Sequence, residues 1–142
     1  MLKFTKLLAA SAAVALFAIP AQAQEAEEPR TTYRVTVIDL EDGADDRWFE
    51  IHETYVAPAR AATGQSAETV HWVMTNPDVD LIVVSEMHGG MAAFDSHANP
   101  HRDAFFAAVR ERAGSDDAME ALGEEIDGLV KSATTYFTHT HP

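Results

Sequence analysis

Two kinds of hydrophobic spacing alternate along this chain, and their order is the strongest constraint on its fold. Residues 33–40 and 68–75 alternate between apolar and polar side chains, which is typical of β-strands. Between these segments, Trp48, Ile51 and Tyr55 recur at three- and four-residue spacing, which indicates a helix. From residue 33 on, the sequence therefore predicts a strand, a helix and a second strand.

The segment after the second predicted strand favours a β-hairpin. Asn76, Pro77 and Asp78 form a turn sequence, and residues 79–87 form a near-continuous apolar run. Such a run is typical of a strand buried on both faces. Because the turn is short, we expect the second and third strands to pair in antiparallel orientation.

The last third of the chain predicts two helices and a strand. Asn99 and Pro100 are suited to begin a helix, and Gly114 is suited to end it. Ser115 then caps a second helix with good three- and four-residue apolar spacing. Residues 133–141 predict the last strand.

Two details concern the first helix. Asp45 or Asp46 is expected to cap its start, where a carboxylate also interacts favourably with the helix dipole. Pro58 lies inside the helical pattern and lacks an N–H group, so we expect it to bend the last turns before Gly64.

The order strand, helix, strand, strand, helix pair, strand is that of a ferredoxin-like α+β domain, with its βαββαβ arrangement and its second helix split. We expect one four-stranded antiparallel sheet in the order 4-1-3-2, with the helices on one face. The other face would then expose apolar side chains to water, which is unfavourable unless another surface covers it.

The amino-terminal residues 1–23 predict an export signal. Lys3 and Lys6 precede an uninterrupted apolar run at 7–19, and Ala21-Gln22-Ala23 offers small residues to a signal peptidase. The run is shorter than the roughly 20 residues that a membrane-spanning helix needs. We therefore expect a periplasmic or secreted protein, with a disordered lead-in at 24–32 and a domain at 33–142.

The composition of the chain argues against two classes of partner and excludes disulfide cross-links. The formal net charge of −13 repels nucleic-acid phosphates and anionic lipid surfaces, so neither nucleic acid nor, after signal cleavage, a membrane is an expected partner. The chain has no cysteine, so no disulfide supports the fold in an oxidising compartment.

These patterns resemble the dimeric α+β barrel superfamily over roughly residues 33–141. The likeness rests on the helix at 48–55, Pro58, Gly64, the strand that contains Trp72, the strand at 80–87 and the split second helix. In that superfamily two ferredoxin-like subunits join their open sheet faces around a cavity. The resemblance implies a homodimer, but members differ in chemistry and none of their catalytic residue sets matches this chain, so activity and cofactor stay open.

Three side chains are candidates for ligand binding in such a cavity. If the sheet side that carries Arg34 on the first strand, His71 on the second and Glu86 on the third is turned away from the helices, all three project into the cavity. There a histidine or arginine can orient a carboxylate as a base or anchor an anionic ligand. The alternative is an internal ion pair between Arg34 and Glu86.

His139 and His141 are candidates for metal binding. They lie two apart on the predicted last strand, so both side chains point to the same face. Two imidazoles so placed are suitable ligands for zinc or copper. The alternative is an exposed, frayed chain end.

For the remaining histidines the sequence gives weaker support for a functional role. His88, Asp95, His97 and His101 surround the connection between the third strand and the following helix, and a polar loop over the cavity mouth is the favoured interpretation. His52 shares a helix stripe with Trp48 and Tyr55 and is expected to be a packed, hydrogen-bonded residue.

The sequence thus predicts an exported homodimer that binds a small organic ligand in the cavity on its sheet face. The main alternative is a periplasmic metal- or haem-binding protein that uses its histidines. A third possibility is a structural module in which the sheet face serves dimerisation alone. A zinc-protease helix is excluded, because no second histidine follows His52 at position 56.

Overall fold

A computed structural model of the protein describes residues 30–141; the predicted export signal and residues 24–29 of the predicted lead-in lie outside them. Four antiparallel strands form one sheet in the order β2-β3-β1-β4. The strands are β1 (Thr32–Leu40), β2 (Thr69–Trp72), β3 (Leu81–Glu86) and β4 (Val130–His139). The predicted ferredoxin-like α+β fold, with its strand order, is confirmed.

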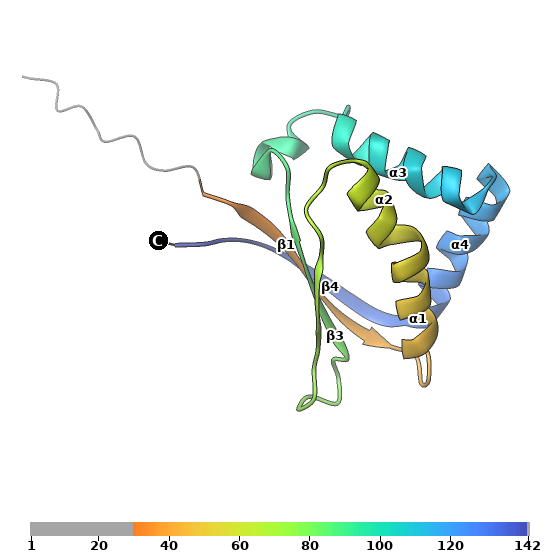
Figure 1. The fold of residues 1–142 in the computed structure, drawn as a ribbon. Helices are drawn as coiled ribbons and strands as arrows, with labels where there is room; N and C mark the ends of the chain where they lie inside the picture. The colour runs from red at the N-terminus through yellow and green to blue at the C-terminus, as the bar shows by residue number, and fades with distance from the viewer. Residues whose placement is uncertain (1–29, 142) are drawn as a thin grey trace, which may run out of the picture.

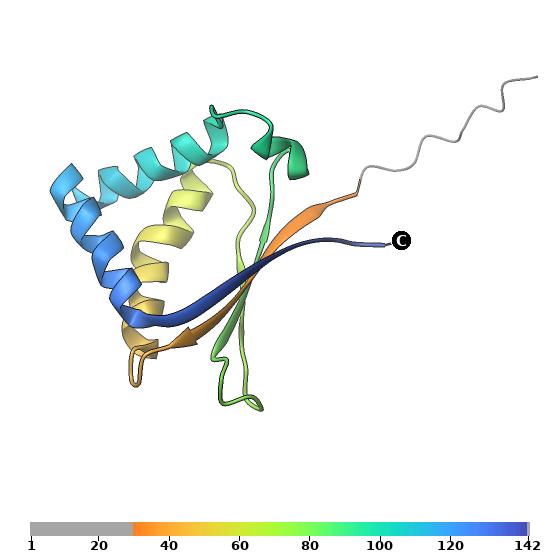
Figure 2. The same cartoon turned by 180° about the vertical axis from the view of Figure 1, so that it is seen from behind.

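The helices form a layer on one side of this sheet (Figure 1, and from behind in Figure 2). The connection from β1 to β2 consists of α1 (Asp45–Ile51), the π-helical turn η1 (His52–Val56) and α2 (Ala57–Ala62). The connection from β3 to β4 consists of the short 3₁₀-helix η2 (Gly90–Phe94), α3 (Pro100–Ala113) and α4 (Asp116–Leu129). Within residues 30–141, no helix is long and apolar enough to cross a membrane.

The ends of α3 and α4 follow from their sequence as predicted. The side chain of Asn99 accepts a hydrogen bond from the Arg102 N–H at 3.0 Å, which satisfies one free donor of the first turn of α3. Gly114 ends this helix with a φ of 92°, a left-handed conformation that glycine adopts without strain. Ser115 caps α4 by accepting from the Ala118 N–H at 3.1 Å.

The first helix differs from the prediction in two details. Ala44 occupies the N-cap position, while Asp45 and Asp46 lie in the first turn and make no side-chain cap, so the expected aspartate cap is wrong. Pro58 falls at the start of α2, directly after the π-helical turn in which the Ala57 N–H bonds to the His52 carbonyl. The distortion therefore precedes the proline rather than following it.

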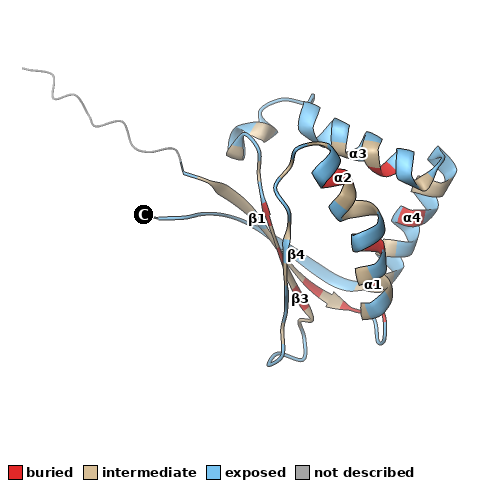
Figure 3. Cartoon of the chain, in the orientation of Figure 1, coloured by how far each residue is buried: buried red, intermediate tan, exposed pale blue. Residues whose placement is uncertain are grey.

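The strand register determines which side chains face the helices. Ile38 lies opposite Leu81, and Thr36 lies opposite Val83, so these residues share one face. Ile38, Leu81 and Val83 are buried in a cluster with Trp48 of α1, which identifies this face as the helix-covered one (Figure 3). A second buried cluster joins the helices to one another, through Ile51, Ala59, Val109 and Leu122.

Among residues 30–141, no helix lies over the opposite face of the sheet in either view (Figures 1 and 2). By alternation it carries Val35 and Val37 of β1 together with Ile82 and Val84 of β3, and all four are only partly buried. An uncovered apolar sheet face was expected from the sequence. A second copy of the chain as its cover stays a prediction.

Candidate functional site

A cavity of about 500 Å³ lies between the helix-facing side of the sheet and the helix layer. It occupies the end of the sheet where β1 begins and β3 ends, since Arg34 and Ser85 border it and are opposite each other in the register. Most of its wall is apolar. The apolar part consists of Ile38, Trp48, Ile51, Val56, Val83, Met87, Ala93, Phe94, Phe105, Phe106, Ile126 and Phe137.

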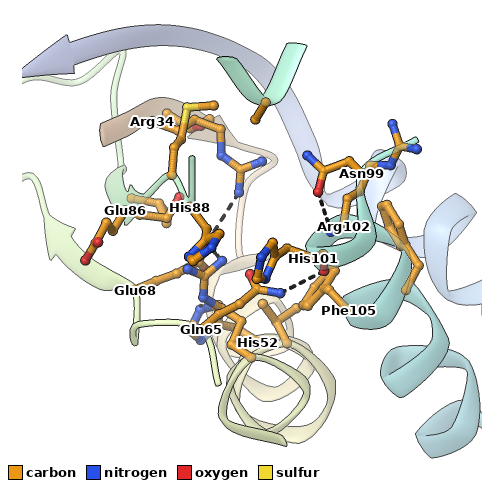
Figure 4. A pocket seen from close by; sticks show the side chains of 18 of the residues that line it. Arg34, His52, Gln65, Glu68, Glu86, His88, Asn99, His101, Arg102 and Phe105 are labelled. Atoms are coloured by element: carbon orange, nitrogen blue, oxygen red, sulfur yellow. Dashed lines mark hydrogen bonds and ion pairs between the residues drawn. The ribbon is translucent and has the colours of Figure 1, made fainter. Parts of the chain in front are cut away.

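The polar part of the wall is centred on Glu68, which lies just before β2. Its side chain is 6% exposed, and its Oε2 atom lies 3.1 Å from Nε2 of His52. Its Oε1 atom lies 3.4 Å from Nη1 of Arg60 and 3.5 Å from Nη2 of Arg34. Figure 4 shows Arg34, Glu68 and His52 on one side of the cavity, with Asn99, Arg102 and Phe105 across from them.

These contacts keep Glu68 ionised. Burial by itself would raise the pKa of the carboxyl group, because the charged form is desolvated. The hydrogen bond with His52 and the positive charge beside the carboxylate, chiefly that of Arg60, outweigh that effect and hold the pKa of Glu68 below its ordinary value. The cavity wall therefore contains a buried carboxylate with three basic neighbours.

Arg60 is the most deeply buried of these neighbours. Its side chain is 7% exposed, and its Nε atom donates to the Ser66 carbonyl at 2.9 Å. Burial lowers the pKa of the guanidinium group, while the charge of Glu68 opposes that shift. The Nη2 atom is buried and has no hydrogen-bond partner within residues 30–141.

The π-helical turn places His52 beside Glu68. The imidazole stacks on Trp48, with ring centroids 5.3 Å apart and planes 12° from parallel, and the side chain is 13% exposed. Stacking fixes the ring plane, so Nε2 is held toward the carboxylate. His52 is packed and hydrogen-bonded, as the sequence predicts, and it also lines the cavity.

His88 and His101 meet at the same cavity, although thirteen positions separate them in the chain. Their ring centroids lie 3.6 Å apart, and the Gln65 side chain donates to the His101 carbonyl at 3.1 Å. Asp95 and His97, which the sequence groups with them, do not line the cavity. Of the four candidate residues in this polar connection, only His88 and His101 therefore line the cavity.

The three predicted ligand-binding residues are not brought onto one face. Arg34 lies opposite Ser85 on the helix-facing side, whereas His71 lies opposite Ile82 and Glu86 lies opposite Tyr33 on the uncovered side. Glu86 reaches the cavity rim and accepts a hydrogen bond from the Ser66 hydroxyl at 2.9 Å. The prediction that these three side chains share one face is wrong. A change of one residue in the strand register exchanges the two faces of a strand, so the faces depend on the register of the assembled sheet.

The alternative to a ligand site was an internal ion pair between Arg34 and Glu86. This pair is not among the ion pairs of residues 30–141, and Arg34 pairs with Glu68 instead.

His139 and His141 lie close together at the end of β4, with ring centroids 5.0 Å apart. Nε2 of His139 lies 3.1 Å from a guanidinium nitrogen of Arg30. Among residues 30–141, no group of three or more histidine, aspartate or glutamate side chains is placed to hold a metal ion. Metal or haem binding by the histidines stays a prediction.

Arg60 and Glu68 are the site residues that the sequence analysis missed. Two signals point to them. Arg60 is the one charged residue in the alanine-rich segment of α2, and it follows the buried Ala59. Glu68 has the same parity as Val70 and Trp72 in the predicted second strand, which places it on the helix-facing side. A buried arginine and a buried glutamate in neighbouring elements are expected to pair.

Comparison with known proteins shows the fold. No family model matches the chain, and no curated protein matches it. A crystal structure of a NIPSNAP family protein with unknown function from Agrobacterium tumefaciens is similar, with a TM-score of 0.50 and 12% sequence identity, over 78% of this chain and 87% of that one. At this identity the likeness supports the ferredoxin-like α+β architecture and carries no residue roles.

Two further solved structures are similar at lower TM-scores. A protein from Pseudomonas aeruginosa has a TM-score of 0.47 and 11% identity, over 80% of this chain and 97% of that one. An uncharacterized NIPSNAP domain protein from Burkholderia xenovorans has a TM-score of 0.42 and 14% identity, over 75% of this chain and 91% of that one.

Proposed function

We propose that this protein binds a small organic molecule in the cavity between its sheet and its helix layer. The observation that carries the proposal is the cavity itself. Its volume of about 500 Å³ is within the range of small-molecule sites, and a mostly apolar wall with a few buried polar groups is their usual composition. The proposed site is thus on the helix-facing side of the sheet, within one chain.

A variant that fills the cavity tests this proposal. Ala93 of η2 lines the cavity, so Ala93→Trp places a large side chain in it without touching Glu68 or Arg60. We expect ligands found by thermal-shift screening of the wild type to lose their effect on this variant. Met74→Trp is the matched control, because Met74 is 88% exposed and lies outside the cavity.

The variant His71→Ala distinguishes a site between the sheet and the helices from a site on the uncovered face. If the ligand binds between sheet and helices, His71→Ala leaves the thermal shift unchanged, because His71 is on the other side of the sheet. A ligand response that disappears in His71→Ala but persists in Ala93→Trp would place the site on the uncovered face and refute the proposal.

We further propose that two copies of the chain form a homodimer through the uncovered sheet face. Support comes from the partly buried Val35, Val37, Ile82 and Val84 on a face that no helix of residues 30–141 covers. Analytical ultracentrifugation should give a dimer for the wild type and a monomer for Val37→Lys. Glu50→Lys, on the exposed surface of α1, is the control and should remain dimeric. A monomeric wild type would refute dimerisation.

Export is the remaining part of the proposed function, and it rests on residues 1–23. The full chain, expressed in a Gram-negative host, should accumulate in the periplasm with Gln24 as its first residue. Intact-mass measurement of the periplasmic fraction checks this, with Lys3→Glu/Lys6→Glu as a variant that should reduce export. Recovery of the uncleaved chain in the cytoplasm alone would contradict it.

A further inference from the structure

We propose that the ligand of this cavity is an organic monoanion, whose acidic group is bound by Arg60 and Arg34 and whose apolar body lies against the phenylalanines that line the cavity. This inference rests on the proposed function and adds the chemical class of the ligand.

The first observation is the unpartnered donor of Arg60. Arg60 lines the cavity, and its Nη2 atom is buried and has no hydrogen-bond partner within residues 30–141, while its Nε and Nη1 atoms contact Ser66 and Glu68. A buried polar group without a partner is costly, and a guanidinium group is suited to bind two oxygens of one acid group. A ligand acceptor at Nη2 would satisfy this donor.

The second observation is the length of the two arginine contacts with Glu68. Arg60 and Arg34 share the same oxygen, Oε1, at 3.4 Å and 3.5 Å. A strong charge-assisted hydrogen bond has a length of about 2.7–2.9 Å, so both guanidinium groups retain capacity for a second acceptor. Arg34 is also 49% exposed, which leaves it free to turn toward a ligand.

The third observation is the local charge. Two arginines face one buried carboxylate, which leaves one positive charge in excess at this part of the wall. Of the other charged lining residues, Arg102 pairs with Asp103 at 2.9 Å, and Glu86 is exposed at the rim, where it accepts from Ser66. One excess positive charge matches a carboxylate or sulfonate, whereas a dianionic phosphate would bring a second, uncompensated charge into a buried site.

The rest of the wall suits an apolar, preferably aromatic, ligand body. Phe94 and Phe137 contact each other edge to face at 5.2 Å, and Phe105 and Phe106 do so at 5.4 Å. All four line the cavity, and Phe94, Phe106 and Phe137 are exposed. Such rings gain stability when another apolar group covers them.

The test uses two fluorescent probes that differ in one acidic group, anilinonaphthalene sulfonate and its uncharged parent phenylnaphthylamine. Fluorescence titration of the wild type should show that the sulfonate binds about ten-fold tighter or more, as expected for a hydrogen bond to a charged group. Arg34→Gln and Arg60→Lys should lower the affinity for the sulfonate and leave that for the parent unchanged. Arg110→Gln, on α3 and outside the cavity, is the matched control.

The outcomes separate this inference from the function on which it rests. Equal affinity of the two probes for the wild type, or equal losses for both in the arginine variants, would overturn the monoanion and leave the cavity as a binding site. Failure of both probes to bind, or binding that Ala93→Trp does not reduce, would overturn both proposals. Arg60→Lys keeps the charge beside Glu68, and the exposed Arg34 provides a second variant should the first fail to fold.

Discussion

The two ends of the space between sheet and helices are filled in different ways. At the end where β1 finishes, Leu40, Ala44 and Leu81 belong to one buried cluster, and Leu81 is 0% exposed. At the end where β1 begins, the same sheet face carries Arg34 and Ser85, and the layers enclose a cavity. The alternation of the strands continues through both ends, but the polarity of the helix-facing side chains changes along them.

This difference separates folding from binding within a single layer interface. The packed end, with the second cluster between the helices, supplies apolar burial that stabilises the domain. The cavity end contains a buried charged group that costs desolvation and is not needed to close the core. Residues at the packed end are therefore expected to determine stability, and residues at the cavity end, apart from the buried Glu68, to determine affinity.

The largest expected effect is at the packed end. Leu81→Ala removes a fully buried side chain and should lower the free energy of unfolding by about 3 kcal/mol, measured by urea denaturation. Phe137→Ala, at the cavity end, is the comparison, because Phe137 is 44% exposed and its loss should cost only about 0.5 kcal/mol. Equal losses in the two variants would remove the distinction between the ends.

A smaller effect is expected for the buried carboxylate. Glu68→Gln should lower the free energy of unfolding by about 2 kcal/mol at neutral pH, because Arg60 and His52 lose a charged partner. Since folding lowers the pKa of Glu68, its charge stabilises the native state above the ordinary value of 4.5, and that contribution is lost as the pH falls through the lower native value. The gap between variant and wild type should therefore narrow in acid.

Denaturation curves at neutral and acidic pH measure this gap. Glu124→Gln, at an exposed position of α4, is the control and should show no comparable loss at either pH. A gap for Glu68→Gln that widens in acid would show that the buried carboxylate destabilises the ionised native state.

The smallest expected effect concerns affinity. Phe137→Ala should weaken the binding of phenylnaphthylamine about five-fold, because one aromatic contact of about 1 kcal/mol is lost, with little change in stability. Met74→Ala removes an exposed apolar side chain outside the cavity and should leave the titration unchanged. Equal affinity for wild type and Phe137→Ala would exclude Phe137 from the binding wall.

Local patterns predicted most of the fold. Asn99, Gly114 and Ser115 act on the backbone within a few residues of themselves, so their roles as helix caps and stop could be inferred from sequence alone. Alternation in the first two strands, the apolar run of the third and the pattern at 133–141 located each strand to within three residues at each end. The two-residue spacing of His139 and His141 predicted one shared face, and their ring centroids lie 5.0 Å apart.

The candidate site was harder to predict, because it depends on relations between distant elements. His71 and Glu86 were grouped with Arg34, but the pairing register that separates them is a property of the assembled sheet. The Arg60–Glu68 contact joins the end of α2 to the start of β2 across an irregular connection, and periodicity carries no information on how such a connection folds back.

The π-helical turn determines which side of its helix Arg60 occupies. In an uninterrupted α-helix, residues eight positions apart, such as His52 and Arg60, differ by about 80° around the axis. The turn takes up about one extra residue, which reduces the difference to about 20° and lets both side chains reach Glu68. A homologue with one residue fewer between these two positions would form a regular α-helix and keep its arginine toward the cavity, because residues seven positions apart also differ by about 20°. The π-helical turn thus lets this helix contain one additional residue without moving Arg60 out of the cavity wall.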